Sequence, residues 1–374
     1  MSILRIQEWF DDIGDRPVMI AGPCSAESDE QIQKTADALS GPCKPSFFRA
    51  GIWKPRTRPG TFSGVGTKGL QWMIKVKERT GMRLTVEAAS PRHVEACLKA
   101  GIDVIWLGAR TVSNPFSVQE IAEALKGVDI PVLVKNPLNP DIDLWLGAIE
   151  RINNAGISKV AAVHRGFSPF ERTRYRNMPK WEIAIELRRR LKEISVLCDP
   201  SHIGGDVVMV PELAQKAMDL NMDGLMLEVH HDPLSALSDN KQQLLPENYC
   251  RLIENLVIRC PKPEDPGFIN QLDELRSQID SVDHQLIELL SRRLEIIDMI
   301  GHYKYSNNAA ILQMDRWVEI LNTRLEQAGL LGLDRDFTER YLKLMHQESI
   351  RRQTDIMKKM EEKQGKSADK GPDN

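Results

Sequence analysis

Cys260-Pro-Lys-Pro-Glu-Asp-Pro-Gly267 divides this chain of 374 residues into two parts. Three prolines and a glycine in so short a run prevent a helix or a central strand from continuing through it. We therefore predict one domain over residues 1–259, a linker over 260–267 and a second domain over 268–357. Residues 358–374 are polar and charged, and we expect them to form a disordered tail.

The composition is that of a globular protein with buried cores, because apolar residues make up 41% of the chain. A net charge of −3 argues against a general nucleic-acid binder. No apolar run approaches the ~20 residues of a membrane helix, and Met1–Phe10 does not resemble a secretory signal. The six cysteines include no C-x-x-C pair. These features predict a cytoplasmic protein with reduced thiols that binds neither nucleic acid nor membrane.

Before the linker, from Pro17 to Arg259, short apolar runs alternate with amphipathic helical stretches. Eight strand–helix units in a domain of this length predict an α/β fold of the (β/α)8, or TIM barrel, type. A doubly wound open sheet is the alternative, because periodicity does not show closure. The predicted strands are Val18–Gly22, Phe47–Gly51, Leu84–Ala88, Val104–Gly108, Val132–Lys135, Val160–His164, Val196–Cys198 and Leu225–Val229.

Cationic side chains follow several of these strands, whose carboxyl ends would meet on one face of a barrel. Arginine presents a planar fork that matches phosphate and carboxylate oxygens. A single arginine at a strand end is more often a surface ion-pair partner, but six cations at successive strand ends are hard to explain in that way. We therefore predict small, multiply anionic substrates. The six cations are Arg49, Lys54, Arg56, Arg110, Lys135 and Arg165.

A second set, Cys24, His202, Glu228 and Asp239, follows predicted strands one, seven and eight. Taken alone, Cys24 is typical of a small buried hydrophobe and His202 of a loop or core histidine. Together they offer sulfur, nitrogen and oxygen ligands, which suit a borderline divalent metal such as Mn²⁺, Fe²⁺, Co²⁺ or Zn²⁺ better than Mg²⁺ or Ca²⁺. Of these metals, we expect Mn²⁺. Two carboxylates in the set indicate an open, catalytic site.

The motifs of the first domain resemble those of the 3-deoxy-D-arabino-heptulosonate 7-phosphate (DAHP) synthases. The matching motifs are Ala21-Gly-Pro-Cys-Ser-Ala-Glu27, Lys54-Pro-Arg-Thr57, Gly108-Ala-Arg-Thr111, Asp199-Pro-Ser-His202 and the segment from Glu228 to Asp239. The resemblance implies condensation of phosphoenolpyruvate with erythrose 4-phosphate, the reaction that opens the shikimate pathway. It further implies that Cys24, His202, Glu228 and Asp239 hold the metal, that Arg49, Lys54, Arg110, Lys135 and Arg165 hold phosphoenolpyruvate, and that Arg56 and Thr57 help to hold erythrose 4-phosphate.

Lys54 has two possible roles at this site. Crowding by Arg49 and Arg56 would lower its pKa and allow a proton shuttle, or Lys54 would act only as an electrostatic clamp. The related octulosonate phosphate synthases share the barrel and use arabinose 5-phosphate, and Lys54-Pro-Arg-Thr57 favours erythrose 4-phosphate instead. An aldolase with a Schiff-base lysine at Lys135 is an alternative of a different enzyme class.

After Phe268 the apolar residues recur at helical spacing, through a first segment that continues to about Tyr305. Two more helical segments are predicted near Met314–Ala328 and Asp334–Met360. So short a module buries little apolar surface by itself, and we predict a homodimer, or a higher homo-oligomer, formed through the long helix. The alternative is a dimerisation or effector-binding module without chemistry, whose charges are solvated.

The second domain resembles the all-helical chorismate mutases through Leu275-Arg276, Asp283, Arg293, Lys304, Asp315-Arg316, Glu348-Ser349 and Gln353. The resemblance implies rearrangement of chorismate to prephenate. Arg276, Arg293 and Arg316 would hold two carboxylates, Lys304 and Gln353 would bond the ether oxygen, and Ser349 would assist binding. The reaction is intramolecular, so holding the reactive conformer and stabilising charge on the breaking bond suffice.

This chain departs from the mutase pattern near the third arginine, where Gln313 and Trp317 replace the family's frequent Asp and Glu. These two positions therefore leave the contact to the ring hydroxyl of chorismate unassigned. The alternative to an active mutase is a degenerate domain with a purely regulatory role. Only a short segment precedes the first predicted strand. We therefore expect feedback to act through the helical domain, with prephenate as a candidate effector.

Overall fold

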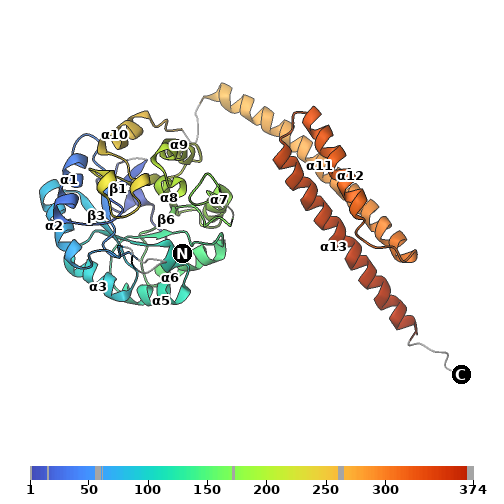
Figure 1. Cartoon of the computed structure of the whole chain (residues 1–374), viewed down its shortest axis with the longest axis horizontal. Coiled ribbons are helices and arrows are strands. Elements are labelled where there is room, and N and C mark those ends of the chain that lie inside the picture. Colours follow the sequence, from blue (N-terminus) through green and yellow to red (C-terminus); the bar gives the residue numbers. More distant parts are fainter. Residues whose placement is uncertain are drawn as a thin grey trace. The chain divides into compact units, whose positions relative to one another are not determined.

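The computed structural model describes residues 2–368 except 15–16, 55–59, 61, 171–172 and 260–264, and for residues 364–368 it describes only the backbone. Contacts divide the chain into two units, Met1–Pro261 and Lys262–Asn374. This boundary lies inside the predicted linker. Figure 1 shows the first unit in blue to yellow and the second in orange to red. In the described part of the chain, no helix is both long and apolar enough for a membrane span.

The first unit is a closed barrel of eight parallel strands, each followed by at least one helix, which confirms the predicted fold. Each predicted strand agrees with the observed one to within a residue at either end. The strands are β1 (Val18–Gly22), β2 (Phe47–Ala50), β3 (Arg83–Glu87), β4 (Val104–Leu107), β5 (Val132–Lys135), β6 (Val160–His164), β7 (Ser195–Cys198) and β8 (Gly224–Glu228). Closure comes from the pairing of β1 with β8, in which Gly22 is the partner of Glu228.

Local sequence signals set the ends of several barrel helices. The side chains of Ser28, Ser90 and Asp141 each accept an N–H from the first turn of a helix. Gly81 and Gly101 follow helix ends with positive φ, a conformation that glycine adopts without strain. The helices are α1 (Asp29–Leu39), α2 (Lys68–Thr80), α3 (Pro91–Ala100), α4 (Ala109–Val112), α5 (Pro115–Ala124), α6 (Ile142–Asn154), α7 (Trp181–Arg190), α8 (Pro200–Gly204), α9 (Val210–Asp219) and α10 (Pro246–Asn255).

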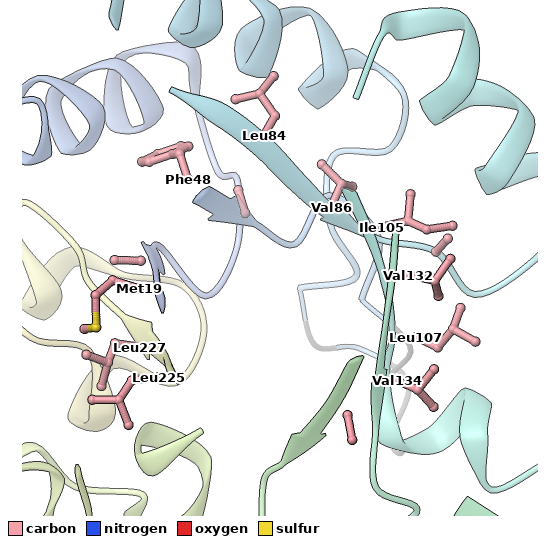
Figure 2. Packing of buried hydrophobic residues seen from close by; sticks show 14 of the residues in the cluster. Met19, Phe48, Leu84, Val86, Ile105, Leu107, Val132, Val134, Leu225 and Leu227 are labelled. Atoms are coloured by element: carbon pink, nitrogen blue, oxygen red, sulfur yellow. The ribbon is translucent and has the colours of Figure 1, made fainter. Parts of the chain in front are cut away.

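Strand side chains alternate between two cores, because successive residues of a strand point to opposite faces. The outer core packs the strands against the helices, and Figure 2 shows residues such as Leu84, Val86 and Val132 directed away from the barrel interior. The inner core fills the barrel with Ile20, Trp106 and other strand residues. The barrel is therefore a packed core, and its polar site must lie at a mouth.

The segment before β1 belongs to the inner core. Ile6 begins the 3-10 helix η1 (Ile6–Glu8), and Trp9 follows it. Both side chains are buried among the strand residues that point into the barrel. A hydrogen bond fastens this segment to the barrel, because Ile6 N–H donates to Ser195 Oγ (3.0 Å) at the start of β7. Ser195 lies at the amino end of its strand, so the segment closes the mouth opposite the carboxyl ends.

The second unit consists of three helices, α11 (Pro266–Ser306), α12 (Met314–Leu330) and α13 (Arg335–Ala368). This confirms the predicted helical region. Helix α13 packs along α11 and also contacts α12. Gly301 of α11 is buried where a Cβ would lie 3.1 Å from Ile356 Cδ1, so glycine permits close approach of these helices.

Helix α13 continues to Ala368, where the sequence analysis expected a disordered tail from residue 358. For residues 358–368 that expectation is corrected. Lys and Glu are good helix formers, and Lys358 and Glu362 have the i,i+4 spacing that supports a helix. Residues 369–374 lie outside the described part of the chain.

Candidate active sites

A polar cavity lies at the carboxyl ends of the strands in the barrel. It is lined by five of the six predicted cations, while Arg56, together with Thr57, lies outside the described residues. Arg49, Lys135 and Arg165 are buried, whereas Arg110 is exposed. The cavity lining is Arg49, Lys54, Glu87, Trp106, Gly108, Ala109, Arg110, Lys135, Arg165, Arg176, His202 and Asp239.

Arg49 is the deepest of these cations, with 1% of its surface exposed. Its Nη2 donates to Glu228 Oε1 (3.1 Å), and its guanidinium lies 5.1 Å from the centre of the Trp106 ring. Among the described residues, its Nε and Nη1 have no hydrogen-bond partner. A buried guanidinium with unpaired donors is costly unless an anion completes its bonds. The geometry therefore suits an anionic ligand.

Lys135 and Asp199 form a buried ion pair of 2.7 Å. Burial lowers the pKa of Lys135, although Asp199 opposes this effect. The pKa of Asp199 lies well below its ordinary value, because His202 and Lys135 outweigh burial, which acts to raise it. Asp199 is thus an anion that holds a lysine on one side and a histidine on the other.

Cys24, Glu228 and Asp239 lie together at the edge of the cavity. Their ligand atoms all lie within 4.8 Å of one another. Cys24 Sγ lies 3.3 Å from Asp239 Oδ2, and Lys54 Nζ donates to the same sulfur at 3.2 Å. Burial, together with Glu228 and Asp239, raises the pKa of Cys24 to about 12. Two carboxylates beside a buried sulfur form a donor set that fits a divalent cation.

His202 completes the predicted ligand set. Its Nδ1 lies 2.9 Å from Asp199 Oδ2, and its Nε2 lies 3.7 Å from Glu228 Oε1. Burial lowers the pKa of His202, which favours the neutral ring. If Nδ1–H donates to Asp199, Nε2 presents a lone pair toward a carboxylate oxygen. Two acceptors that face each other fit a shared cation, and a carboxylate on the second nitrogen is the usual support of a metal-ligating histidine.

The surroundings of Lys54 favour one of the two roles that its sequence left open. Burial alone would lower its pKa, but Cys24, Glu87 and Glu228 together raise it above the ordinary value. Neighbouring Arg49 acts in the expected direction and is outweighed. The ammonium form is therefore stabilised, which favours a clamp over a proton shuttle.

Sequence reasoning missed several residues that shape this cavity. Arg176 Nη1 donates to Asp239 Oδ1 (3.0 Å) and to Gln242 Oε1 (2.5 Å), and Gln242 Nε2 donates to Glu228 Oε2 (2.7 Å). These contacts orient two predicted metal ligands. Arg176 lies between β6 and α7, and Gln242 ends the short 3-10 helix η4 (Asn240–Gln242). No periodic pattern marks either residue. Asp199 belongs to a quoted motif, so only its role was missed.

In the helical unit, the structure brings together three of the predicted residues. Arg293 Nη1 donates to Ser349 Oγ (3.0 Å), and Gln353 Nε2 donates to the Ser349 carbonyl (3.1 Å). Lys304 lies on the Arg293 side of α11 and donates to the Ile311 carbonyl (2.5 Å). Ser349 and Gln353 are buried, and Gln353 Oε1 has no partner among the described residues.

Arg276 lies apart from this group, whereas Arg316 of α12 contacts a neighbour on its own helix. Arg276 is on the same helix as Arg293, and a rise of ~1.5 Å per residue separates them by about 25 Å. Arg276 is exposed and pairs with Asp273 (3.3 Å). Arg316 is exposed and pairs with Glu319 (2.7 Å).

Both units of the chain match known protein families. Residues 7–257 match the DAHP synthetase I family, and residues 275–354 match chorismate mutase type II. The phospho-2-dehydro-3-deoxyheptonate aldolase of Thermotoga maritima is 32% identical over 251 residues, which cover 66% of this chain and 72% of that protein. The 2-dehydro-3-deoxyphosphooctonate aldolase of Koribacter versatilis is 27% identical over 253 residues, which cover 62% of this chain and 86% of that protein.

Solved structures are similar to the barrel. The crystal structure of the Thermotoga maritima DAHP synthase has a TM-score of 0.57 at 33% identity and covers 63% of this chain and 67% of that chain. A truncated form of the 3-deoxy-D-arabino-heptulosonate 7-phosphate synthase from Thermotoga maritima has a TM-score of 0.54 at 30% identity. The match covers 63% of this chain and 84% of that chain.

Proposed function

Because the chain belongs to the DAHP synthetase I family and carries a chorismate mutase type II domain after its barrel, we propose which residues perform its two reactions. The first reaction condenses phosphoenolpyruvate with erythrose 4-phosphate, and the second rearranges chorismate to prephenate. The observation that carries the barrel assignment is the buried Arg49 guanidinium, whose Nε and Nη1 have no partner among the described residues.

Phosphoenolpyruvate binds with its phosphate and carboxylate among Arg49, Lys54, Arg110, Lys135 and Arg165. These cations line one cavity, and planar guanidinium groups match both anions. Arg165 is held by Asn177, to which its Nη1 donates at 2.8 Å. The proposal for erythrose 4-phosphate rests on the Lys54-Pro-Arg-Thr57 motif alone, with Arg56 and Thr57 as its ligands.

A divalent metal, with Mn²⁺ favoured over Fe²⁺, Co²⁺ and Zn²⁺, is held by Cys24, His202, Glu228 and Asp239. The donor set and the facing acceptors of His202 and Glu228 support this assignment. When bound, the metal supplies a Lewis acid that polarises the aldehyde oxygen.

The protein residues bring the reacting carbons together. The enol carbon of phosphoenolpyruvate forms a bond with the aldehyde carbon, water adds at the carbon that carries phosphate, and phosphate leaves. Lys54, held as an ammonium by its acidic neighbours, stabilises anionic oxygen during these steps.

The test of the barrel assignment is a condensation assay on the purified chain, with Arg49→Ala as the variant. We expect phosphoenolpyruvate binding to weaken at least tenfold in the variant, because a charge-assisted contact is lost. Borohydride added with substrate distinguishes the metal-assisted reaction from a Schiff-base reaction at Lys135, since only the Schiff-base reaction forms a reducible adduct. Trapping of a covalent adduct at Lys135 would overturn the metal-assisted mechanism.

Chorismate binds in the helical unit against Arg293, Ser349, Gln353 and Lys304. Arg293 and Arg316 bind carboxylates, while Lys304 and Gln353 bond the ether oxygen. Arg276 lies too far along α11 to reach this group within one chain, so a second copy supplies it. The exposed apolar side chains of α11, including Leu275, Ile279 and Leu289, support pairing of two chains along this helix. Chorismate consumption that is lost in Arg276→Ala would support the shared site.

Feedback acts from the helical site on the barrel. Prephenate bound at Arg293 favours a state with a less competent barrel, and a coupling of ~1–3 kcal/mol gives roughly 5–150-fold inhibition when expressed in substrate affinity. Prephenate is titrated into the condensation assay with the intact chain, the isolated barrel and Arg293→Ala. Inhibition that persists unchanged in the isolated barrel would place the effector elsewhere.

A further inference from the structure

Helix α13 presents a histidine beside the mutase residues. His346, Ser349 and Gln353 have the spacing i, i+3, i+7, so they lie on one face of the helix. Ser349 accepts a hydrogen bond from Arg293, which places this face against α11. His346 is half-buried, one turn before the buried Ser349.

The His346 ring is held in place by a tryptophan. It stacks on Trp317 of α12, with ring centres 3.9 Å apart and planes inclined by 12°. Trp317 directly follows Arg316, a predicted carboxylate ligand. The stack therefore fixes the imidazole between the helix that carries Arg316 and the helix that carries Ser349.

The imidazole is neutral near pH 7. Burial lowers the pKa of His346, and the nearby cations Arg293 and Lys304 lower it further. A neutral imidazole has one donor and one acceptor, so it can pair with a hydroxyl group in either sense. It is a poor partner for a carboxylate compared with the surrounding arginines.

The chemistry of chorismate leaves one group without a partner in the predicted site. Its two carboxylates match the arginines, and its ether oxygen matches Lys304 and Gln353. Gln313 and Trp317 stand where mutases often have acidic residues, so no carboxylate from these positions is available for the ring hydroxyl. Trp317 instead stacks on His346.

We propose that His346, positioned by Trp317, forms the hydrogen bond to the ring hydroxyl of chorismate. The inference rests on the proposed mutase function and names the residue that replaces the missing carboxylate contact. No proton needs to be transferred, because the rearrangement breaks the C–O bond and forms the C–C bond within one molecule. His346 is a substrate-binding residue, and Trp317 is a positioning residue that acts through it.

The test measures chorismate consumption by the full chain carrying His346→Phe or His346→Gln. Phe preserves an aromatic surface for Trp317 but cannot hydrogen-bond, whereas Gln can. We expect His346→Phe to lower kcat/KM about 10–100-fold, consistent with loss of a buried hydrogen bond, and His346→Gln to recover most of the loss. His302→Phe, at an exposed position of α11, is the matched control and should behave as wild type.

A substrate change provides a second readout that does not depend on the variants folding. A chorismate analogue with hydrogen in place of the ring hydroxyl should bind the wild type about tenfold or more weakly than chorismate, and His346→Phe should bind the two about equally. Equal binding of both compounds to the wild type would overturn the inference. So would discrimination that persists in His346→Phe and disappears in Gln313→Ala.

Failure of the inference is distinguishable from failure of the mutase function. A wild-type chain that converts chorismate, with Arg293→Ala strongly impaired, supports the function whatever His346 does. Full activity in His346→Phe would then refute only the role of His346. Absence of chorismate conversion and of prephenate binding in the wild type would refute both.

Discussion

The sulfur of Cys24 contacts the ammonium group of Lys54 and a carboxylate oxygen of Asp239. Lys54 Nζ donates to its sulfur, and Asp239 Oδ2 lies 3.3 Å from it. Replacing the sulfur with oxygen keeps a polar atom in place but removes the soft ligand. The stability of the barrel should therefore change less than the metal affinity does.

We expect Cys24→Ser to weaken Mn²⁺ binding at least about tenfold, because a neutral hydroxyl is a poor substitute for a thiolate ligand. Binding is measured by electron paramagnetic resonance of free Mn²⁺ during titration. Cys43→Ser, at a half-buried position outside the cavity lining, is the control and should bind Mn²⁺ as the wild type does. Unchanged affinity in Cys24→Ser would remove Cys24 from the ligand set.

His164 makes the barrel sensitive to acid. Its ring is fully buried against Trp145, Phe167 and Trp181, and burial lowers its pKa to about 4. The unfolded value is near 6.5, so the unfolded chain binds the proton first as pH falls. The stability contributed by neutral His164 is present above pH 6.5 and is lost as pH falls toward 4.

From this linkage, the free energy of unfolding should fall by about 2 kcal/mol between pH 7 and pH 5 through His164 alone. His164→Phe, which retains an aromatic ring, should lose that share of the pH dependence. Urea denaturation followed by tryptophan fluorescence at the two pH values provides the comparison. The same pH dependence in both proteins would show that another group is responsible.

At the scale of elements, the segment before β1 packs into the barrel at the mouth opposite the polar cavity. Trp9 is 3% exposed within the inner core, and its Nε1 donates to the Leu4 carbonyl (3.2 Å). The cavity lining does not include Trp9. Its contribution should therefore be to stability and not to substrate binding.

Trp9→Ala should lower the free energy of unfolding by about 3–5 kcal/mol, the range for truncating a buried tryptophan. The KM for phosphoenolpyruvate should stay within about twofold at temperatures where the variant is folded. Thermal unfolding and steady-state kinetics on the same preparation test both statements. A large rise in KM without loss of stability would contradict this division of roles.

At the scale of the whole molecule, the two chemistries depend on different groups. The candidate metal ligands all lie in the barrel, whereas the proposed mutase site uses Arg, Lys, Ser and Gln together with the single histidine His346, which is too few ligands for a metal site. Chelation should abolish the condensation and spare the mutase. Both activities are measured in EDTA and after Mn²⁺ is restored. Loss of mutase activity in a protein that stays folded would contradict the separation.

The division of contacts near Pro261 also predicts two separable pieces. A fragment of residues 264–374 should fold as a dimer, because the apolar side chains of α11 are exposed in one copy. Sedimentation of the fragment tests this. A folded monomer would contradict both the dimer and the shared position of Arg276.

The sequence by itself determined the eight strands, the three helices and the strand-end residues, because those features depend on local periodicity and on chain order. In a parallel barrel all carboxyl ends meet, so Arg49, Lys135 and Glu228 could be assigned to one mouth before any contact was known. The prediction from sequence was wrong for residues 358–368, where helix-forming Lys and Glu prevail over the polarity that predicts disorder.

Only the tertiary structure decided the contacts between groups far apart in sequence. Arg176 and Gln242 reach the predicted metal ligands from connecting segments that carry no periodic signal. The direction of the Lys54 pKa shift follows from Cys24, Glu87 and Glu228, which the fold places around the ammonium. The stack of Trp317 on His346 likewise depends on how α12 and α13 pack. Such contacts arise from three-dimensional packing, since electrostatic and stacking interactions depend on distance in space and not along the chain.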